Sequence, residues 1–278
     1  MHAILTVARK EFRDGLRNRW ALAITLVFAF LALGLSYFGA AASGTLGFTP
    51  LATTVVSLAS LAIFLIPLIA LLLAYDSIVG EEEQGTLLLL LTYPLSPGQL
   101  LVGKFLGLAA ILALSTLAGF GGAGLLIGLL TGQLADPDLW RAFGFFIFSA
   151  ILLGWTFIAI AQLISVLTGE KSRAAGLALI VWFWFVLVFD LLLLGLLVMG
   201  EGQGNGGWLG ALLLANPTDV FRIANLAGFQ AVREYTGLAA VATGPLFRPS
   251  SLSLVLVAWV AVPLALAVWR FRRVAAGR

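Results

Sequence analysis

Long apolar runs separated by short polar segments dominate this chain. Each run is long enough to cross about 30 Å of hydrocarbon as an α-helix, which takes roughly 20 residues. The runs cover residues 21–42, 53–75, 101–130, 143–168, 174–199 and 252–269. The pattern predicts an all-α integral membrane protein with six transmembrane helices.

A different pattern precedes the first run, in the segment ILTVARKEFRDGLRNRW. Leu5, Ala8, Phe12, Leu16 and Trp20 recur at intervals of three or four residues, with charged residues between them. This spacing places the apolar side chains along one side of a helix, as in helices that lie in the membrane interface. We expect an N-terminal interfacial helix over residues 1–20; the alternative is a basic leader that only anchors the chain.

The composition agrees with a membrane protein. Apolar residues make up 61% of the chain and charged residues only 10%, whereas charged residues approach a quarter of a soluble domain. The net charge of +3 comes from basic residues that flank the apolar runs, as topology determinants do. We therefore expect membrane lipid and no nucleic acid as a partner. The positive-inside rule is satisfied when both termini lie in the cytoplasm.

With that orientation, residues 200–251 form a loop outside the cytoplasm. The loop begins with the glycine-rich stretch GEGQGNGG and continues with a more apolar segment that Asn216 and Pro217 interrupt. The apolar part is sufficient to bury one side of a helix. We expect short helices that rest on the outer membrane surface.

Glycines are regularly spaced in the third apolar run. Gly124, Gly128 and Gly132 follow one another at four-residue intervals, which places them on one face of a helix. Small residues on one face allow two helices to approach closely in a membrane. We expect helix packing there, within the subunit or across a dimer; the alternative is that glycine is simply common in membrane helices.

Asp190 is the one acidic residue deep inside an apolar run. A carboxylate within the membrane is costly and by default suggests a function, such as contact with a proton or a substrate. The alternative is a protonated or hydrogen-bonded aspartate that fixes helix packing. The cores of the other runs contain no lysine, arginine or histidine to pair with it, and both interpretations stay open.

Metal and catalytic chemistry have few candidate residues. The chain has no cysteine, and its only histidine is His2. Copper(I) prefers thiolate and thioether ligands, but only Met1 and Met199 could offer a thioether. We expect no metal site, no catalytic triad and no bound cofactor in this chain.

One string resembles a phosphate-binding loop. Gly98, Gly103 and Lys104 match G-x-x-x-x-G-K, but Phe105 stands where the motif needs a serine or threonine hydroxyl. No buried strand precedes the string, as the motif requires. We interpret the match as coincidence.

An acidic segment, Glu81 to Glu83, lies between the second and third runs. Gly80 can break the helix before it, so the glutamates would begin a new turn, where the helix dipole favours anions. The stretch TLLLLL follows, and Pro94 and Pro97 would end that helix. Acidic and exposed apolar side chains together favour a helix that docks on a partner; an amphipathic turn in the headgroups is disfavoured, because anionic lipid would repel it.

The segment GEEEQGTLLLLLTYPLSPGQLLVGK resembles the cytoplasmic loop of ABC type-2 exporter permeases. That family has G-E-x-x-x-G-T, a later P-l-s and a lysine at the third span, and the six runs and NPTDVFR also fit it. The resemblance implies a single permease domain over residues 1–278, with residues 76–100 as the coupling loop. It further implies a homodimer in the bacterial inner membrane and a separate ATPase that holds ATP and Mg.

The same resemblance implies which residues would contact the ATPase. Two cytoplasmic loops would contribute Gly80, Glu81, Glu82, Glu83, Gly85, Thr86, Gly169, Glu170, Lys171 and Arg173.

Within this family, the chain resembles permeases that support maturation of nitrous oxide reductase in denitrification. This implies a periplasmic partner protein, an indirectly acting copper chaperone, and assembly of the enzyme's copper-sulfur site. The permease would export a sulfur species or signal mechanically to the periplasmic partner. Alternatives are an ABC exporter of an amphipathic drug or lipid, and a proton-coupled carrier that uses Asp190.

Overall fold

The computed structural model describes residues 2–17, 19–38, 51–132, 134–135, 137–199, 206–226 and 245–276, and every regular element in them is helical. Six helical segments in this part of the chain are long and apolar enough to cross a membrane, which confirms the predicted fold class. They are α2 (Trp20–Phe38), α3 (Leu51–Ala74), α6 (Pro97–Thr131), α7 (Pro137–Leu167), α8 (Lys171–Phe183) with its continuation, and α14 (Pro249–Ala276). The predicted residues 39–42 of the first span, and most of the glycine-rich stretch after Met199, lie outside the described residues.

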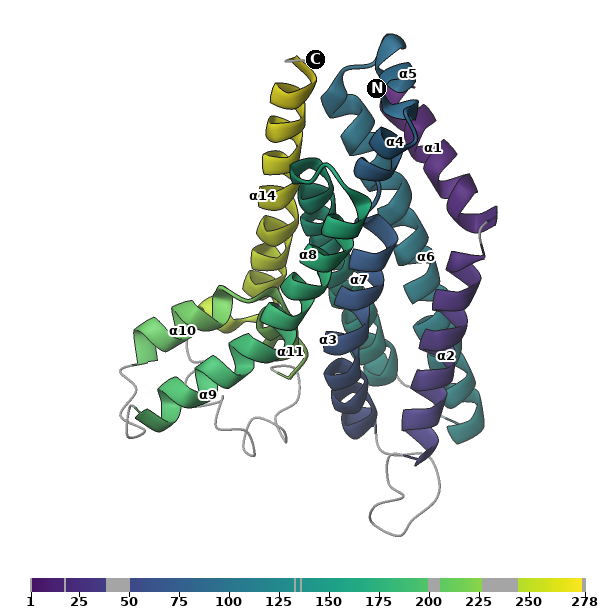
Figure 1. Cartoon of the computed structure of the whole chain (residues 1–278). Helices are drawn as coiled ribbons and strands as arrows, with labels where there is room; N and C mark the ends of the chain where they lie inside the picture. The colour runs from purple at the N-terminus through teal and green to yellow at the C-terminus, as the bar shows by residue number, and fades with distance from the viewer. Residues whose placement is uncertain are drawn as a thin grey trace.

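Both chain termini lie at the same end of the bundle (Figure 1). We call it the termini end. The amphipathic helix α1 (His2–Arg17) and two short helices, α4 (Val79–Glu83) and α5 (Thr86–Thr92), lie there. At the opposite end, α10 (Gly206–Leu214) and α11 (Pro217–Leu226) precede the 3-10 turn η3 (Pro245–Phe247) and α14.

Small residues on α6 allow α1 and α2 to pack closely against it. A Cβ atom added to Gly107 would lie 2.8 Å from the carbonyl oxygen of Ala8 on α1, and one added to Gly119 would lie 2.8 Å from that of Thr25 on α2. Such contacts are possible only without a side chain, because real Cβ atoms do not approach oxygen so closely. Glycine therefore brings the backbones of α1 and α2 against α6, as small residues do between membrane helices.

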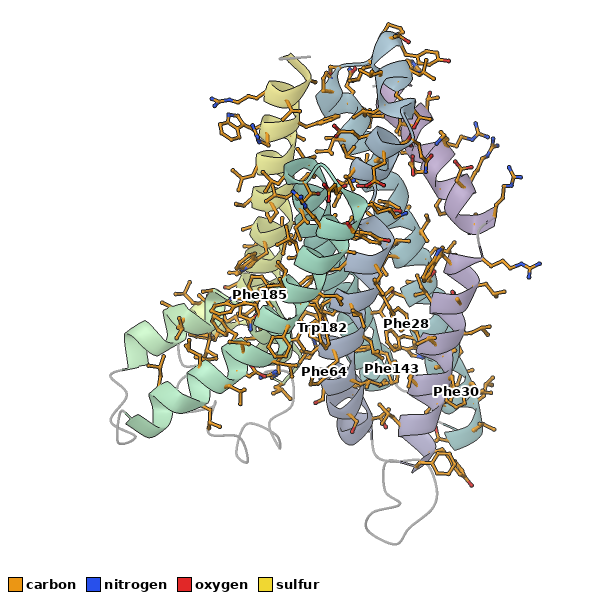
Figure 2. The ribbon with its side chains drawn as sticks, viewed as in Figure 1. Phe28, Phe30, Phe64, Phe143, Trp182 and Phe185 are labelled. Atoms are coloured by element: carbon orange, nitrogen blue, oxygen red, sulfur yellow. The ribbon has the colours of Figure 1, made fainter. Side chains whose placement is uncertain are left out.

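Aromatic rings connect the helices in the interior. Phe28 of α2 stacks on Phe120 of α6 at 4.6 Å between ring centroids, and Phe120 meets Phe146 of α7 edge to face at 4.9 Å. Phe146 lies 6.2 Å from Phe221 of α11. Figure 2 shows Phe28 between the helices and Phe30 on the outer side of α2, where Phe30 is exposed. The stack joins four helices across the core.

α6 begins at Pro97, one turn earlier than predicted. The Ser96 hydroxyl accepts a hydrogen bond from the backbone N–H of Gln99, and the Gln99 side chain accepts one from the backbone N–H of Ser96. This reciprocal pair is a capping box, and proline is favoured at the first helical position. The prediction that Pro97 ends the preceding helix is therefore wrong, because Pro97 begins the next one.

The fifth span has a break in its regular α-helix. After α8, the chain passes through a π-helical stretch, η2 (Trp184–Val188), into α9 (Phe189–Met199). Figure 1 shows α9 leaning away from the bundle beside α10. A π-helical insertion leaves the helix one residue out of register and often marks a functional position.

α11 does not rest on the surface, as predicted for the helices of the outer loop. Most of its side chains are buried, among them Val220, Phe221 and Ala224. It packs against α3, α7 and α14. Asn216 and Pro217 do divide this segment into two helices, α10 and α11, as expected. They also start α11, since the Asn216 side chain accepts a hydrogen bond from the backbone N–H of Thr218 at 3.0 Å. The prediction is corrected: α11 is a wedge inserted into the bundle.

α1 is confirmed as an amphipathic helix, and its apolar stripe is divided between the bundle and the exposed surface. Val7 is its buried residue, and Val7 packs at Gly103 of α6. Within the stripe, Phe12 packs against the core, whereas Leu5 and Leu16 are exposed. An exposed apolar stripe on a helix at one end of a membrane bundle is the arrangement expected of an interfacial helix.

Candidate functional site

The acidic segment folds into two helices instead of one. α4 contains the three glutamates, and α5 contains the leucines. Gly85 separates them with a φ of 71°, a left-handed conformation that glycine adopts without the steric penalty of a side chain. Gly80 does not break the helix before the glutamates, because it lies buried within α4. The prediction that the glutamates start the leucine helix is therefore wrong.

The start of α4 is fixed to α7. The backbone N–H groups of Ile78 and Val79 both donate to the hydroxyl of Ser165, each at 3.0 Å. Ser165 therefore satisfies two N–H groups that a helix start leaves without an intrahelical partner. This attachment places α4 against the end of a membrane-spanning helix.

Glu81 lies at the centre of an ion-pair network. Lys104 of α6 is only 3% exposed, and its ammonium lies 3.0 Å from Glu81 and 2.8 Å from Glu11 of α1. The Thr86 hydroxyl donates to the Glu81 carboxylate and also contacts the Glu81 carbonyl oxygen at 3.1 Å. One buried cation thus joins α1, α4 and α6, and Thr86 adds the start of α5.

Glu83 and Asp76 connect the two predicted loops. The Glu83 carboxylate accepts a hydrogen bond of 2.6 Å from the backbone N–H of Lys171, which is the first residue of α8. A carboxylate at this place is favoured by the helix dipole. The ammonium of Lys171 lies 2.7 Å from Asp76. The segment after α3 and the start of α8 are therefore one structural unit.

The other residues of the second loop make fewer contacts. Arg173 pairs with Glu170 at 3.0 Å, and both side chains are more than half exposed. Gly169 is also exposed. Exposed pairs of this kind contribute little to stability, so this loop is held mainly through Lys171.

At the termini end, the outward surface of α5 and the residue after it is mostly apolar. Leu88, Leu89 and Tyr93 are each more than 60% exposed. Beside them, Glu82 and Gly85 line a groove of about 430 Å³ together with Leu87 and Leu88. We define the candidate coupling surface as Glu82, Gly85, Leu88, Leu89 and Tyr93. Glu81 and Glu83 are turned toward their own chain, which leaves Glu82 as the glutamate beside the groove.

A second polar cluster lies at the opposite end, around Asp190. Arg222 of α11 donates to both oxygens of Asp190, at 2.6 Å and 3.3 Å, and lies 3.1 Å from Asp219. Asn216 donates to Asp219 at 3.0 Å. The prediction left Asp190 without a cation because only the spans were considered, whereas Arg222 comes from the loop.

Asp219 is the most deeply buried acid of this cluster, and its pKa is raised. Its side chain is 2% exposed, and this burial raises the pKa of Asp219 to about 7, with Asp190 adding to the rise and Arg222 opposing it. A single guanidinium faces two carboxylates, so the cluster favours retaining a proton. Among the residues that the structure describes, no group of three or more histidine, cysteine, aspartate or glutamate side chains could hold a metal ion.

Comparison with known proteins decides the family. The family model for ABC-2 family transporter proteins matches residues 5–275. The chain belongs to this family. The "Probable ABC transporter permease protein NosY" of Stutzerimonas stutzeri is 56% identical over 273 residues, which cover 98% of this chain and 99% of that protein. The protein of the same name from Pseudomonas aeruginosa is 55% identical over the same shares.

The family assignment confirms the resemblance found in the sequence. The chain is a permease subunit, the membrane component of an ABC transporter. ATP is handled in such systems by a partner ATPase.

The predicted packing glycines have different surroundings. A Cβ atom on Gly124 would lie 3.1 Å from the ring of Phe143 on α7, and Gly128 is buried. Gly132 instead ends α6 with a φ of 71° and has no atom within 4 Å of a Cβ position. Gly132 is therefore a helix cap; a role across a dimer stays a prediction.

Sequence reasoning missed Glu11, Asp76, Ser165 and Arg222 as members of the polar clusters. For Asp76 the available signal was a charge directly after an apolar run, because a charge at such a position needs a partner. Ser165 is uncharged and Arg222 lies in the loop, so this signal did not point to them. The partners lie far away along the chain, and the sequence alone does not pair them.

Proposed function

We propose that this chain couples ATP hydrolysis by a separate cytoplasmic ATPase to assembly of the copper-sulfur site of nitrous oxide reductase. The proposal places both termini in the cytoplasm and the permease in the bacterial inner membrane as a homodimer. By resemblance to NosY permeases, the ATPase would be NosF and the periplasmic partner NosD. The copper chaperone NosL would act indirectly.

The candidate coupling surface is the observation that carries the proposal. α5 presents apolar side chains outward, while α4 behind it is attached to α1, α6, α7 and α8. A partner that pushes on α5 therefore acts on several membrane helices together. Apolar side chains in a groove supply affinity, and an adjacent charge guides orientation.

A continuous path leads from this surface to the opposite end. Lys171, held by Glu83 and Asp76, begins α8, and α8 continues into η2. In η2, the carbonyl oxygen of Phe185 accepts hydrogen bonds from Asn216 at 2.9 Å and from Thr218 at 3.1 Å. A displacement of the start of α8 would thus reach α11 through direct bonds.

This arrangement favours mechanical signalling over export of a sulfur species. Several buried hydroxyls in the spans bond to their own helix, as Thr116 does to Leu112 and Thr156 to Leu152. The core between the two ends is filled with apolar side chains, among them the contacting rings of Phe28, Phe120 and Phe146. The carrier alternative loses support, because Asp190 is already paired with Arg222.

The test uses inverted membrane vesicles that contain the permease with NosF and NosD. Radioactive sulfur metabolites or copper(I) are supplied with and without ATP. ATP hydrolysis without uptake of either tracer supports mechanical signalling, whereas ATP-dependent sulfur uptake supports the sulfur exporter. Activity that survives removal of the ATPase would contradict both versions.

A further inference from the structure

An apolar groove of about 620 Å³ lies along α14, next to the start of α6. It extends on α14 from Ala261 past Ala265 to Trp269, with Val102 of α6 also lining it. Arg272 and Arg273, from the last part of α14, line its end. The groove therefore combines a long apolar part with two cations at one end.

The dimensions of the groove match one leaflet of a bilayer. Twelve residues separate Ala261 from Arg273, which corresponds to a rise of about 18 Å along a helix. Half of a hydrocarbon core of roughly 30 Å is about 15 Å. When the apolar part lies at acyl-chain depth, the arginines and Trp269 lie at the level of the headgroups, where both residue types are favoured.

The two guanidinium groups are available to an anion. Within the described residues, neither Arg272 nor Arg273 is paired with a carboxylate, and both side chains are exposed. Arg273 lies over the ring of Trp269 at 4.0 Å, which holds its charge at the end of the groove. Arg272 lies against Gly98, where an added Cβ atom would be 2.8 Å from Nε.

The position of Arg272 increases the positive potential at this place. Gly98 is the second residue of α6, so the guanidinium lies beside the positive end of a 35-residue helix. A cation beside a helix start is unfavourable unless an anion is close to both. The two arginines and the start of α6 thus all favour a negatively charged ligand.

We infer that this groove binds one anionic phospholipid, with an acyl chain along α14 and the phosphate between Arg272 and Arg273. A second copy of this chain fits less well. A two-fold interface places equivalent residues near each other, and here it would bring Arg270, Arg272 and Arg273 close to the same three cations. An anionic lipid neutralises this positive charge, whereas a symmetric contact between two copies of the chain increases it.

The test is native mass spectrometry of the full-length permease after delipidation, with phosphatidylglycerol or phosphatidylcholine added back. We expect R272Q/R273Q to lower the affinity for phosphatidylglycerol about 25-fold, since each arginine near a membrane surface contributes about fivefold. R272K/R273K keeps the charge and should recover most of the binding. R9Q/R13Q, which removes two exposed charges from α1, is the matched control.

Ala265→Trp fills the groove but keeps both arginines, and it should also reduce phosphatidylglycerol binding. Equal losses in R272Q/R273Q and R9Q/R13Q would overturn the inference, as would unchanged binding in Ala265→Trp. Because the chain has no cysteine, Ala261→Cys adds a unique thiol. Efficient disulfide formation between two copies at that thiol would show a protein interface there and also overturn the inference.

Discussion

The buried cation of Lys104 provides the sharpest prediction. Lys104→Met keeps the length and apolar stem of the side chain but removes the ammonium between Glu11 and Glu81. At separations of 2.8 Å and 3.0 Å, each pair has a Coulomb energy of about 6 kcal/mol at an effective dielectric constant of about 20. Burial of the lysine, which is 3% exposed, offsets much of this energy.

Lys104→Met lowers the stability mainly because it leaves the carboxylates of Glu11 and Glu81 without their cation. Removing one partner of a buried ion pair destabilises a protein by about 3–5 kcal/mol. The side chains of Glu11 and Glu81 keep 16% and 20% exposure, so water solvates the unpaired charges in part. We therefore expect Lys104→Met to lower the free energy of unfolding by about 3 kcal/mol, at the lower end of that range.

The assay is unfolding in mixed detergent micelles, followed by tryptophan fluorescence. Lys10→Met is the matched control, since Lys10 pairs with Asp14 at 3.3 Å while 56% exposed; exposed pairs are worth about 0–1 kcal/mol. The triple variant K104M/E11Q/E81Q removes all three charges and should recover most of the loss. Equal stability of Lys104→Met and Lys10→Met, or no recovery in the triple variant, would refute the reasoning.

Three other changes test separate parts of the structure. Gly107→Val should destabilise the chain by about 1–3 kcal/mol, because its Cβ meets the backbone of α1, whereas Gly122→Val enters open space and should not; unfolding midpoints compare them. Leu88→Glu should reduce copurification of the ATPase about tenfold without changing the unfolding midpoint, since Leu88 is 61% exposed. Asp219 has a pKa of about 7 in the folded chain, against an ordinary value of 3.8. The folded state therefore holds the proton more tightly, and wild type should lose stability relative to Asp219→Asn as the pH rises from about 4 to about 7; unfolding midpoints of both proteins, measured at the two ends of this range, check the direction.

The spans could be predicted because one physical requirement fixes them. A segment that crosses hydrocarbon must satisfy its backbone as a helix and expose apolar side chains, and this leaves a long uninterrupted signal. The amphipathic pattern of α1 was equally clear, because its apolar residues recur every three or four positions within one short segment. Its contact face was not, because the position of α1 depends on Gly103 and Gly107, which lie about a hundred residues further along the chain.

The polar contacts were harder to predict for the same reason. Lys104 reaches Glu11 across 93 positions, and Glu83 reaches the start of α8 across 88. The sequence identified most of these residues as charges near the ends of spans, without showing which of them meet. The placement of α11 escaped prediction because its amphipathic pattern fits a surface helix as well as a wedge; burial of Phe221 against Phe146 decides between them.

If α5 docks on a partner as proposed, the contacts of α4 would let that partner move one part of the bundle relative to another. Lys104 binds α4 to α1 and α6, and the glycine contacts leave little space between α1 and α6. This side should move as one body, because close-packed helices cannot slide without collision. Lys171 binds the same α4 to α8, but α8 continues into the π-helical η2, where the register of the helix changes. A push on α5 therefore acts on a stiff group of helices and on a helix with a built-in irregularity. The difference in displacement would be taken up at η2, next to the carbonyl that Asn216 and Thr218 contact.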